Sequence, residues 1–188
     1  MKMRLFVLLS IIFTFTLFIF GGQTIQFKKP TSEEFKLHRL INNYRASKNL
    51  PSVPLSRSLS HVAQLHVRDL SKYPPRGRCN MHSWSPNGPW TACCYTSDHA
   101  QASCMWNKPR ELTNYTGYGF ECSQMHSAGT NAVSALRSWQ GSTGHNAVII
   151  NQGMWSRQPW KSIGVGIYKR YAVIWFGREK DPDGYWEN

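Results

Sequence analysis

The sequence of 188 residues lacks several patterns that mark common activities. It has no C-x-x-C pair, so a zinc ribbon has little support. It has no G-x-S-x-G turn either. Although Ser83 lies beside His82 and Ser142 lies near His145, a hydrolase with a serine triad is therefore poorly supported. No internal repeat is present, and the length suits one domain preceded by a leader.

Acidic residues are scarce, because ten Asp and Glu oppose 22 Lys and Arg and leave a net charge of +12. Such a charge favours anionic partners, such as a phospholipid or lipopolysaccharide surface or an acidic glycan. The basic residues are scattered without a dense run or a recognisable nucleic-acid motif, so no specific nucleic-acid partner is predicted. Solubility alone is the alternative explanation of the charge.

The longest apolar run, residues 5–20, follows two basic residues at the N-terminus. This pattern is typical of a secretory signal peptide, and its length also suits an uncleaved membrane anchor. We therefore expect residues 1–22 to be a signal peptide or anchor, residues 23–30 a linker and residues 31–188 the folded domain. Either alternative places the domain outside the cytoplasm. It is secreted or periplasmic, or it is held at a membrane through the N-terminal segment alone.

All five cysteines lie in one stretch, residues 79–122, which we interpret as a disulfide-rich insert. In an oxidising compartment such cysteines form disulfides, and their odd number leaves one thiol free or paired with a partner chain. Adjacent cysteines rarely bridge each other, so two neighbours in this stretch are expected to reach different partners. The sequence does not identify the pairing. The candidates are Cys79, Cys93, Cys94, Cys104 and Cys122.

Hydrophobic periodicity predicts three helices. A capping box, Thr-x-x-Glu, opens a helix from residue 31 to about residue 49. The second helix runs from about residue 56 to residue 72, where two prolines follow. The third covers residues 131–140. Three of its side chains are expected to face inward: Val133, Leu136 and Trp139.

Residues 162–168 and 171–176 alternate in polarity and predict an antiparallel hairpin with one buried face. Gly164 and Gly166 share one face of this hairpin, where they would let a helix or another backbone approach closely. Residues 76–114 show no period and predict a long irregular region held by disulfides. Helices first and the clearest hairpin last indicate the α+β class.

Three turn-like segments each carry a side chain suited to a site: His82, Glu121 and His145. We expect these three to converge in one cleft. Two neutral imidazoles and a carboxylate suit zinc or another divalent cation with positions left open for water. The alternative is a hydrogen-bonded network that ties the loops to the core. His66 lies in the apolar stripe of the second helix and is expected to be a satisfied core histidine rather than a ligand.

Tryptophan is the other abundant feature of the irregular regions. Such side chains suit a groove for a glycan or a lipid, and they equally suit the packing of a loop layer held by disulfides. The tryptophans concerned are Trp84, Trp90, Trp106, Trp155 and Trp160.

The motifs and their order resemble the CAP superfamily, also called SCP, which comprises cysteine-rich secretory proteins, antigen 5 and pathogenesis-related proteins. The resemblance covers about residues 31–177. Cys122 replaces the asparagine of the family's G-E-N motif, and Ser142 stands where eukaryotic members have a second glutamate, as in short bacterial relatives. The matching segments are Leu40 to Arg45, Val62 to Leu70, Met81-His82-Ser83, Gly119 to Cys122, Ser138 to Ile149, Ile163 to Gly166 and Trp175-Phe176.

The resemblance implies a bacterial-type member with a three-layer α-β-α sandwich around an antiparallel central sheet. It implies a cleft built from His82, Glu121 and His145, which the insert at residues 84–111 would cover or reshape. It also implies a binding role, including lipid or sterol binding in some members.

The resulting hypothesis is an exported ligand- or surface-binding protein, whose partner is an anionic surface, a lipid, a glycan or a divalent metal. The alternative is a metal-dependent hydrolase acting on an extracellular peptide or cell-wall substrate. In that enzyme Glu121 would act as general base to a metal-bound water. A purely structural envelope protein is the third hypothesis.

Overall fold

The computed structural model describes residues 25–187, so the predicted signal peptide or anchor at residues 1–22 lies outside the described residues. Residues 25–31 form no helix or strand, and the first helix begins at Ser32. Within residues 25–187, no helix combines the length and the apolar character needed to cross a membrane.

The first two predicted helices are present. α1 (Ser32–Ala46) begins with the predicted capping box, in which the Thr31 N–H donates to Glu34 Oε2 at 2.7 Å and the Glu34 N–H donates to Thr31 Oγ1 at 3.2 Å. α2 (Arg57–Lys72) is capped by the Ser56 hydroxyl, which accepts from the backbone of the first turn at 2.9 Å. Both caps satisfy backbone donors that a helix start leaves unpaired.

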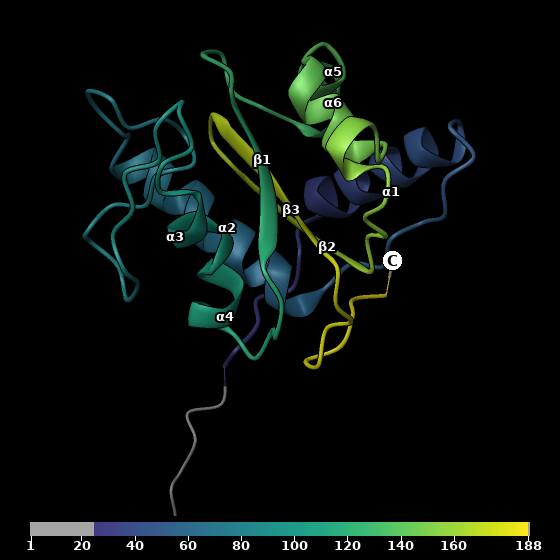
Figure 1. Ribbon diagram of the computed structural model, residues 1–188, viewed down its shortest axis with the longest axis horizontal. Coiled ribbons are helices and arrows are strands. Elements are labelled where there is room, and N and C mark those ends of the chain that lie inside the picture. The colour runs from purple at the N-terminus through teal and green to yellow at the C-terminus, as the bar shows by residue number, and fades with distance from the viewer. Residues whose placement is uncertain (1–24, 188) are drawn as a thin grey trace, which may run out of the picture.

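The sheet has three antiparallel strands in the order β1-β3-β2 (Figure 1). β2 (Ser162–Tyr168) and β3 (Tyr171–Gly177) form the predicted hairpin. β1 (Gly119–Met125) is an edge strand that was not predicted from periodicity. It is buried along six of its seven residues, so its polar side chains are buried as well, unlike those of a half-buried strand.

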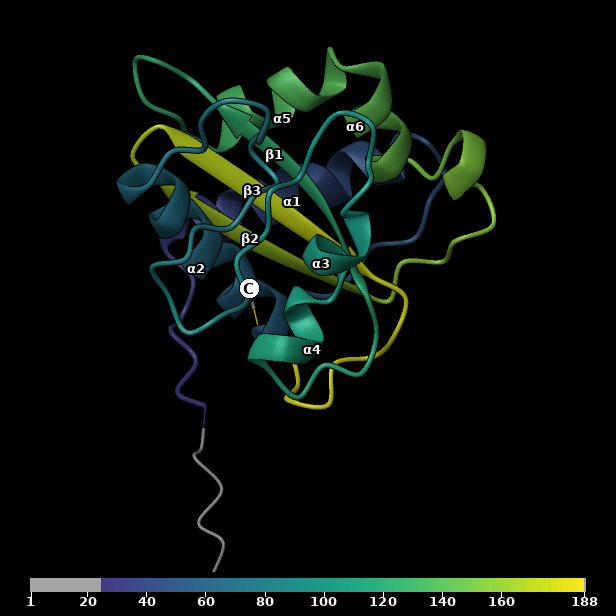
Figure 2. The ribbon, with the colours of Figure 1, turned by 60° about the vertical axis from the view of Figure 1, so that its left-hand side comes forward.

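Helices cover both faces of this sheet, as Figures 1 and 2 show. α1, α5 (Ala132–Gln140) and α6 (Thr143–Ile149) lie on one face. α2 lies on the other face, together with the irregular region and its two short helices, α3 (Ala102–Trp106) and α4 (Lys108–Leu112). The α+β class and the three-layer arrangement are therefore confirmed, and a short 3₁₀ turn (Gly153–Trp155) follows α6.

Two expectations need correction. The region from residue 76 to residue 114 is not wholly irregular, because α3 and α4 interrupt it. In α5, Val133 is 45% exposed rather than inward, since it lies one position past the stripe that faces the core. The residues of α5 that do face the core are Ala132, Ala135, Leu136 and Trp139.

Glycine allows α2 to lie directly on the sheet, as predicted. A Cβ atom at Gly164 would lie 2.1 Å from the carbonyl carbon of Leu59, and one at Gly166 would lie 2.5 Å from that of Ala63. Real Cβ atoms do not approach backbone atoms so closely, so these two positions of β2 set the distance between the sheet and α2.

Two disulfides hold the region between α2 and β1, joining Cys79 to Cys94 and Cys93 to Cys104. The adjacent cysteines therefore reach different partners, as expected, and Cys122 is the free, buried thiol. Of the five tryptophans considered above, Trp84 and Trp160 are buried in the core and the others pack against it.

Candidate functional site

Glu121 is the centre of the candidate site. It lies on β1 in register with Trp175 and Gly164, so its side chain points to the face of the sheet that α2 covers. Its carboxylate is buried and accepts a short hydrogen bond from His66 Nδ1 at one oxygen and a bond from His82 Nδ1 at the other, the latter at 2.7 Å. Both oxygens are thus committed to imidazoles.

His66 enters the site from α2 and has no exposed surface. Its Nε2 donates to the Ser83 carbonyl at 2.9 Å, and its ring stacks on Trp84 with 4.3 Å between centroids. Both ring nitrogens therefore face oxygen atoms, and Glu121 places a carboxylate beside Nδ1. The expectation of a satisfied core histidine describes the burial of His66 correctly but does not identify Glu121 as its partner. A histidine inside an apolar stripe does signal that a buried acceptor must exist.

His82 and His145 complete the cluster. The Nδ1–H of His82 is donated to Glu121, and Nδ1 of His145, in the first turn of α6, hydrogen-bonds Ser142 Oγ at 3.0 Å. The two ring centroids lie 6.4 Å apart. In the described part of the chain, neither Nε2 has a hydrogen-bond partner. The structure therefore brings His82, Glu121 and His145 together, with Glu121 bonded to His82 and the His145 ring beside that of His82.

Burial and neighbouring charge set the pKa values here. Burial alone would raise the pKa of Glu121, but the charge of His66 and the hydrogen bonds from His66 and His82 outweigh it and hold that pKa below its ordinary value. Burial, followed by the charge of His82, lowers the pKa of His145. Burial and the negative charge of Glu121 raise the pKa of Tyr95, whose ring lies 5.1 Å from that of His82.

The lowered pKa of His145 gives a direct prediction. In an NMR titration its imidazole should titrate below the ordinary value of 6.5. His82→Ala should move that midpoint upward, because the variant removes a neighbouring positive charge and admits water. Ser138→Ala, on the exposed surface of α5, is the matched control and should leave the midpoint unchanged. A midpoint at or above 6.5 in the native protein would contradict this arrangement.

Neither Ser83 nor the free thiol is placed to act as a nucleophile. Ser83 Oγ accepts from the Tyr95 N–H at 2.9 Å inside the fold. Burial and the charge of Glu121 raise the pKa of the Cys122 thiol, and that side chain points to the opposite face of the sheet, where it donates weakly to the His145 carbonyl. Ser142 does contact the His145 ring, but it does so from the N-cap position of α6.

The donor set bears on whether a metal fits. Among residues 25–187, no group of three or more His, Cys, Asp or Glu side chains is arranged to hold a metal ion. The Nε2 atoms of His82 and His145 are the two side-chain donors left for a metal ion. Glu121 accepts from Nδ1 of His82 and so fixes the tautomer in which Nε2 carries the lone pair. Two imidazoles suit zinc or a similar divalent cation, provided that water or a ligand supplies the other positions.

Comparison with known proteins finds a family match that includes all the residues of the histidine cluster. The model of the cysteine-rich secretory protein family, CAP, matches residues 38–173. No curated protein matches the chain significantly.

Three solved bacterial structures have a similar fold. An extracellular protein with an SCP domain from Bacillus anthracis has a TM-score of 0.55 and 20% identity, covering 78% of this chain and 40% of that one. An outer surface protein from Borrelia burgdorferi has a TM-score of 0.53 and 16% identity, covering 81% and 97%. A cysteine-rich secretory protein from Staphylococcus aureus has a TM-score of 0.51 and 15% identity, covering 81% and 42%. The chain thus spans less than half of two of these proteins.

Proposed function

The chain belongs to the cysteine-rich secretory protein (CAP) family, and from that premise we propose that it is an exported binding protein of the cell envelope or extracellular space. The apolar N-terminal run, with its basic start, supports export. Two disulfides support an oxidising compartment. Two proteins of similar fold are described as an extracellular protein and an outer surface protein, which agrees with this location.

We further propose that His82 and His145 together hold a divalent cation, such as zinc, that a bound ligand helps to coordinate. One observation carries this proposal. Glu121 accepts a hydrogen bond from the Nδ1–H of His82, which leaves the lone pair of Nε2 available, and the centroids of the His82 and His145 rings lie 6.4 Å apart. A bound cation would supply a Lewis acid for an anionic or carbonyl group of the ligand. With only two protein ligands, binding would be weak until the ligand joins.

The hydrolase alternative has less support. A general base needs a free lone pair within reach of the attacking water. Both oxygens of Glu121 already accept from imidazoles, and the carboxylate itself is buried. A purely structural role remains the competing explanation, since the same bonds also tie the loop that carries His82 to β1.

Calorimetric titration with zinc tests the cation proposal. At pH 7.5 we expect His82→Ala and His145→Ala each to weaken zinc binding by about tenfold or more, because each removes one of two nitrogen ligands. His126→Ala, an exposed histidine in the loop after β1, should leave binding unchanged. Affinity should fall as the pH is lowered and the imidazoles protonate. Equal zinc binding by all four proteins would leave the structural role as the better explanation.

A further inference from the structure

A second surface, at the C-terminal end of α2, is separate from the histidine cluster. One cavity there, of about 390 Å³, is lined by Arg68, Ser71, Lys72, Tyr168 and Lys169. Its lining thus holds three cations and two hydroxyl groups but no carboxylate. The last turns of α2 supply one wall, and the turn between β2 and β3 supplies the other.

The tyrosine in this cavity lies between two of the cations. The Arg68 guanidinium carbon is 5.2 Å from the centre of the Tyr168 ring, and Lys169 Nζ is 5.3 Å from it. Arg68 also donates to the Gln64 carbonyl at 2.9 Å, which fixes the side chain along α2. The positive groups are therefore held in place by neutral partners.

These cations are not neutralised within the described residues. Arg68, Lys72, Lys169 and the nearby Arg76 take part in none of the ion pairs there, which involve other lysines and the site histidines. The closest acid on α2 is Asp69, which is 5% exposed and turned inward. Its carboxylate accepts from the backbone and the hydroxyl of Ser85. The surface is thus left with an uncompensated positive charge.

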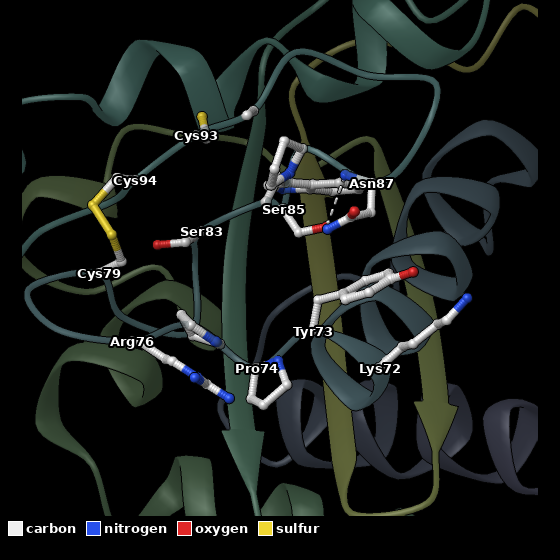
Figure 3. Close-up of a pocket in the computed structure, with 14 residues that line it drawn as sticks. Lys72, Tyr73, Pro74, Arg76, Cys79, Ser83, Ser85, Asn87, Cys93 and Cys94 are labelled. Atoms are coloured by element: carbon white, nitrogen blue, oxygen red, sulfur yellow. Dashed lines mark hydrogen bonds between the residues drawn. A yellow bond between two sulfur atoms is a disulfide. The ribbon is translucent and has the colours of Figure 1, made fainter.

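An apolar groove of about 490 Å³ adjoins this cavity and shares Lys72 with it. Its walls combine proline, aromatic and disulfide groups with five polar or charged side chains. In Figure 3, Tyr73 and Pro74 lie between Lys72 and Arg76, and the Cys79–Cys94 disulfide lies beyond Arg76. The groove lining further includes Pro75, Ser83, Trp84, Ser85, Pro86, Asn87, Ala92 and Cys93.

We propose that this surface binds a phosphate-bearing amphiphile. Its phosphate would lie among Arg68, Lys72 and Lys169, and its apolar part would lie in the groove beside Tyr73 and Pro74. Charge complementarity selects an anionic head, because three cations without a carboxylate line one cavity. The adjoining apolar groove selects an apolar tail, which an acidic glycan or free phosphate lacks.

Titration calorimetry with dodecyl phosphate and dodecyl maltoside, both below their micellar concentrations, tests this inference. We expect the phosphate to bind at least about tenfold more tightly than the maltoside, which has the same tail and no charge. Arg68→Gln with Lys169→Gln should weaken dodecyl phosphate binding by about tenfold to thirtyfold. Tyr73→Ser should also weaken it, because the Tyr73 ring lines the groove and its centre lies 5.0 Å from Lys72 Nζ.

The matched control changes the same charge elsewhere. Lys48→Gln with Arg157→Gln removes two exposed cations that line neither cavity, and Lys48 likewise lies over a tyrosine ring, that of Tyr44. An equal loss in this control would mean that only diffuse charge attracts the amphiphile, which would overturn the inference. Equal affinity for the maltoside would overturn it, and so would inorganic phosphate binding as tightly as dodecyl phosphate.

The result is independent of the histidine cluster, because the two sites share no ligand side chain. His145→Ala, in the helical layer on the other face of the sheet, should therefore keep full dodecyl phosphate binding even where it weakens zinc binding. Urea unfolding of Arg68→Gln with Lys169→Gln, and of Tyr73→Ser, should give the native midpoint, since these side chains lie on the surface or in the half-buried wall of the groove.

Discussion

Glu121→Gln is expected to lower the free energy of unfolding by about 3–5 kcal/mol at pH 7. The native carboxylate accepts from His66 and His82 inside the fold. The amide has the same shape, but one of its two polar groups is an NH₂ donor, so that group would face an imidazole N–H, and the two imidazoles would lose their negatively charged partner. Urea unfolding followed by far-UV circular dichroism measures the difference.

The matched control for this substitution is Glu179→Gln, which removes an exposed carboxylate 3.9 Å from Lys161. Exposed ion pairs contribute little, so this variant should stay within about 0.5 kcal/mol of the native protein. A loss of stability in Glu121→Gln no larger than in the control would show that the buried cluster does not stabilise the fold.

The dependence of stability on pH below 4.5 gives a second test of the Glu121 carboxylate. Because the folded pKa of Glu121 lies below its ordinary value of 4.5, its contribution is fully present above pH 4.5 and is lost as the pH falls through the folded value. The stability gap between the native protein and Glu121→Gln should therefore narrow below pH 4.5. A gap that widens on acidification would contradict the lowered pKa.

Gly164→Ala is expected to cost about 3 kcal/mol or more. The added methyl group would lie 2.1 Å from the carbonyl carbon and 2.2 Å from the carbonyl oxygen of Leu59. Both atoms belong to the backbone of α2, so no change of rotamer relieves the clash. The helix must move away from the sheet, which opens space around the core residues it carries. Thermal and urea unfolding measure the loss.

Gly144→Ala is the matched control, since no atom lies within 4 Å of its added methyl group. It lies in the first turn of α6, where alanine is the better helix former, so its stability should be unchanged or higher by up to about 1 kcal/mol. Equal effects at both glycines would show that the spacing between α2 and β2 tolerates a side chain.

Local patterns account for what could be predicted of the fold. α1, α2, α5 and the β2–β3 hairpin each follow from caps, prolines and periodicity within a few residues. β1 was missed because its alternation of apolar and polar side chains is short and ends at Gln124, and because the partner of a buried carboxylate can be distant in sequence. Glu121, for example, bonds a histidine that is 55 residues away in sequence.

The site shows the same difference between local motifs, which can be identified in the sequence, and distant partners, which cannot. His82, Glu121 and His145 were named from their motifs, and the structure places them together. The apolar stripe predicts only that His66 is a core histidine, because periodicity shows on which face of a helix a side chain lies. It does not show which residue lies opposite. The pairing of cysteines was unpredictable for a similar reason, since it depends on how residues 76–114 fold back.

The position of β1 at the edge of the sheet has a mechanical consequence. His82 belongs to the loop layer over one face and His145 to the helical layer over the other, and the two rings meet around this strand. A molecule bonded to both rings would join the outer layers directly, so any sliding of one layer against the other would stretch those bonds. At a ligand concentration about one hundred times the dissociation constant, binding would raise the free energy of unfolding by about 2.7 kcal/mol. The melting temperature of the domain would therefore rise when the ligand is bound.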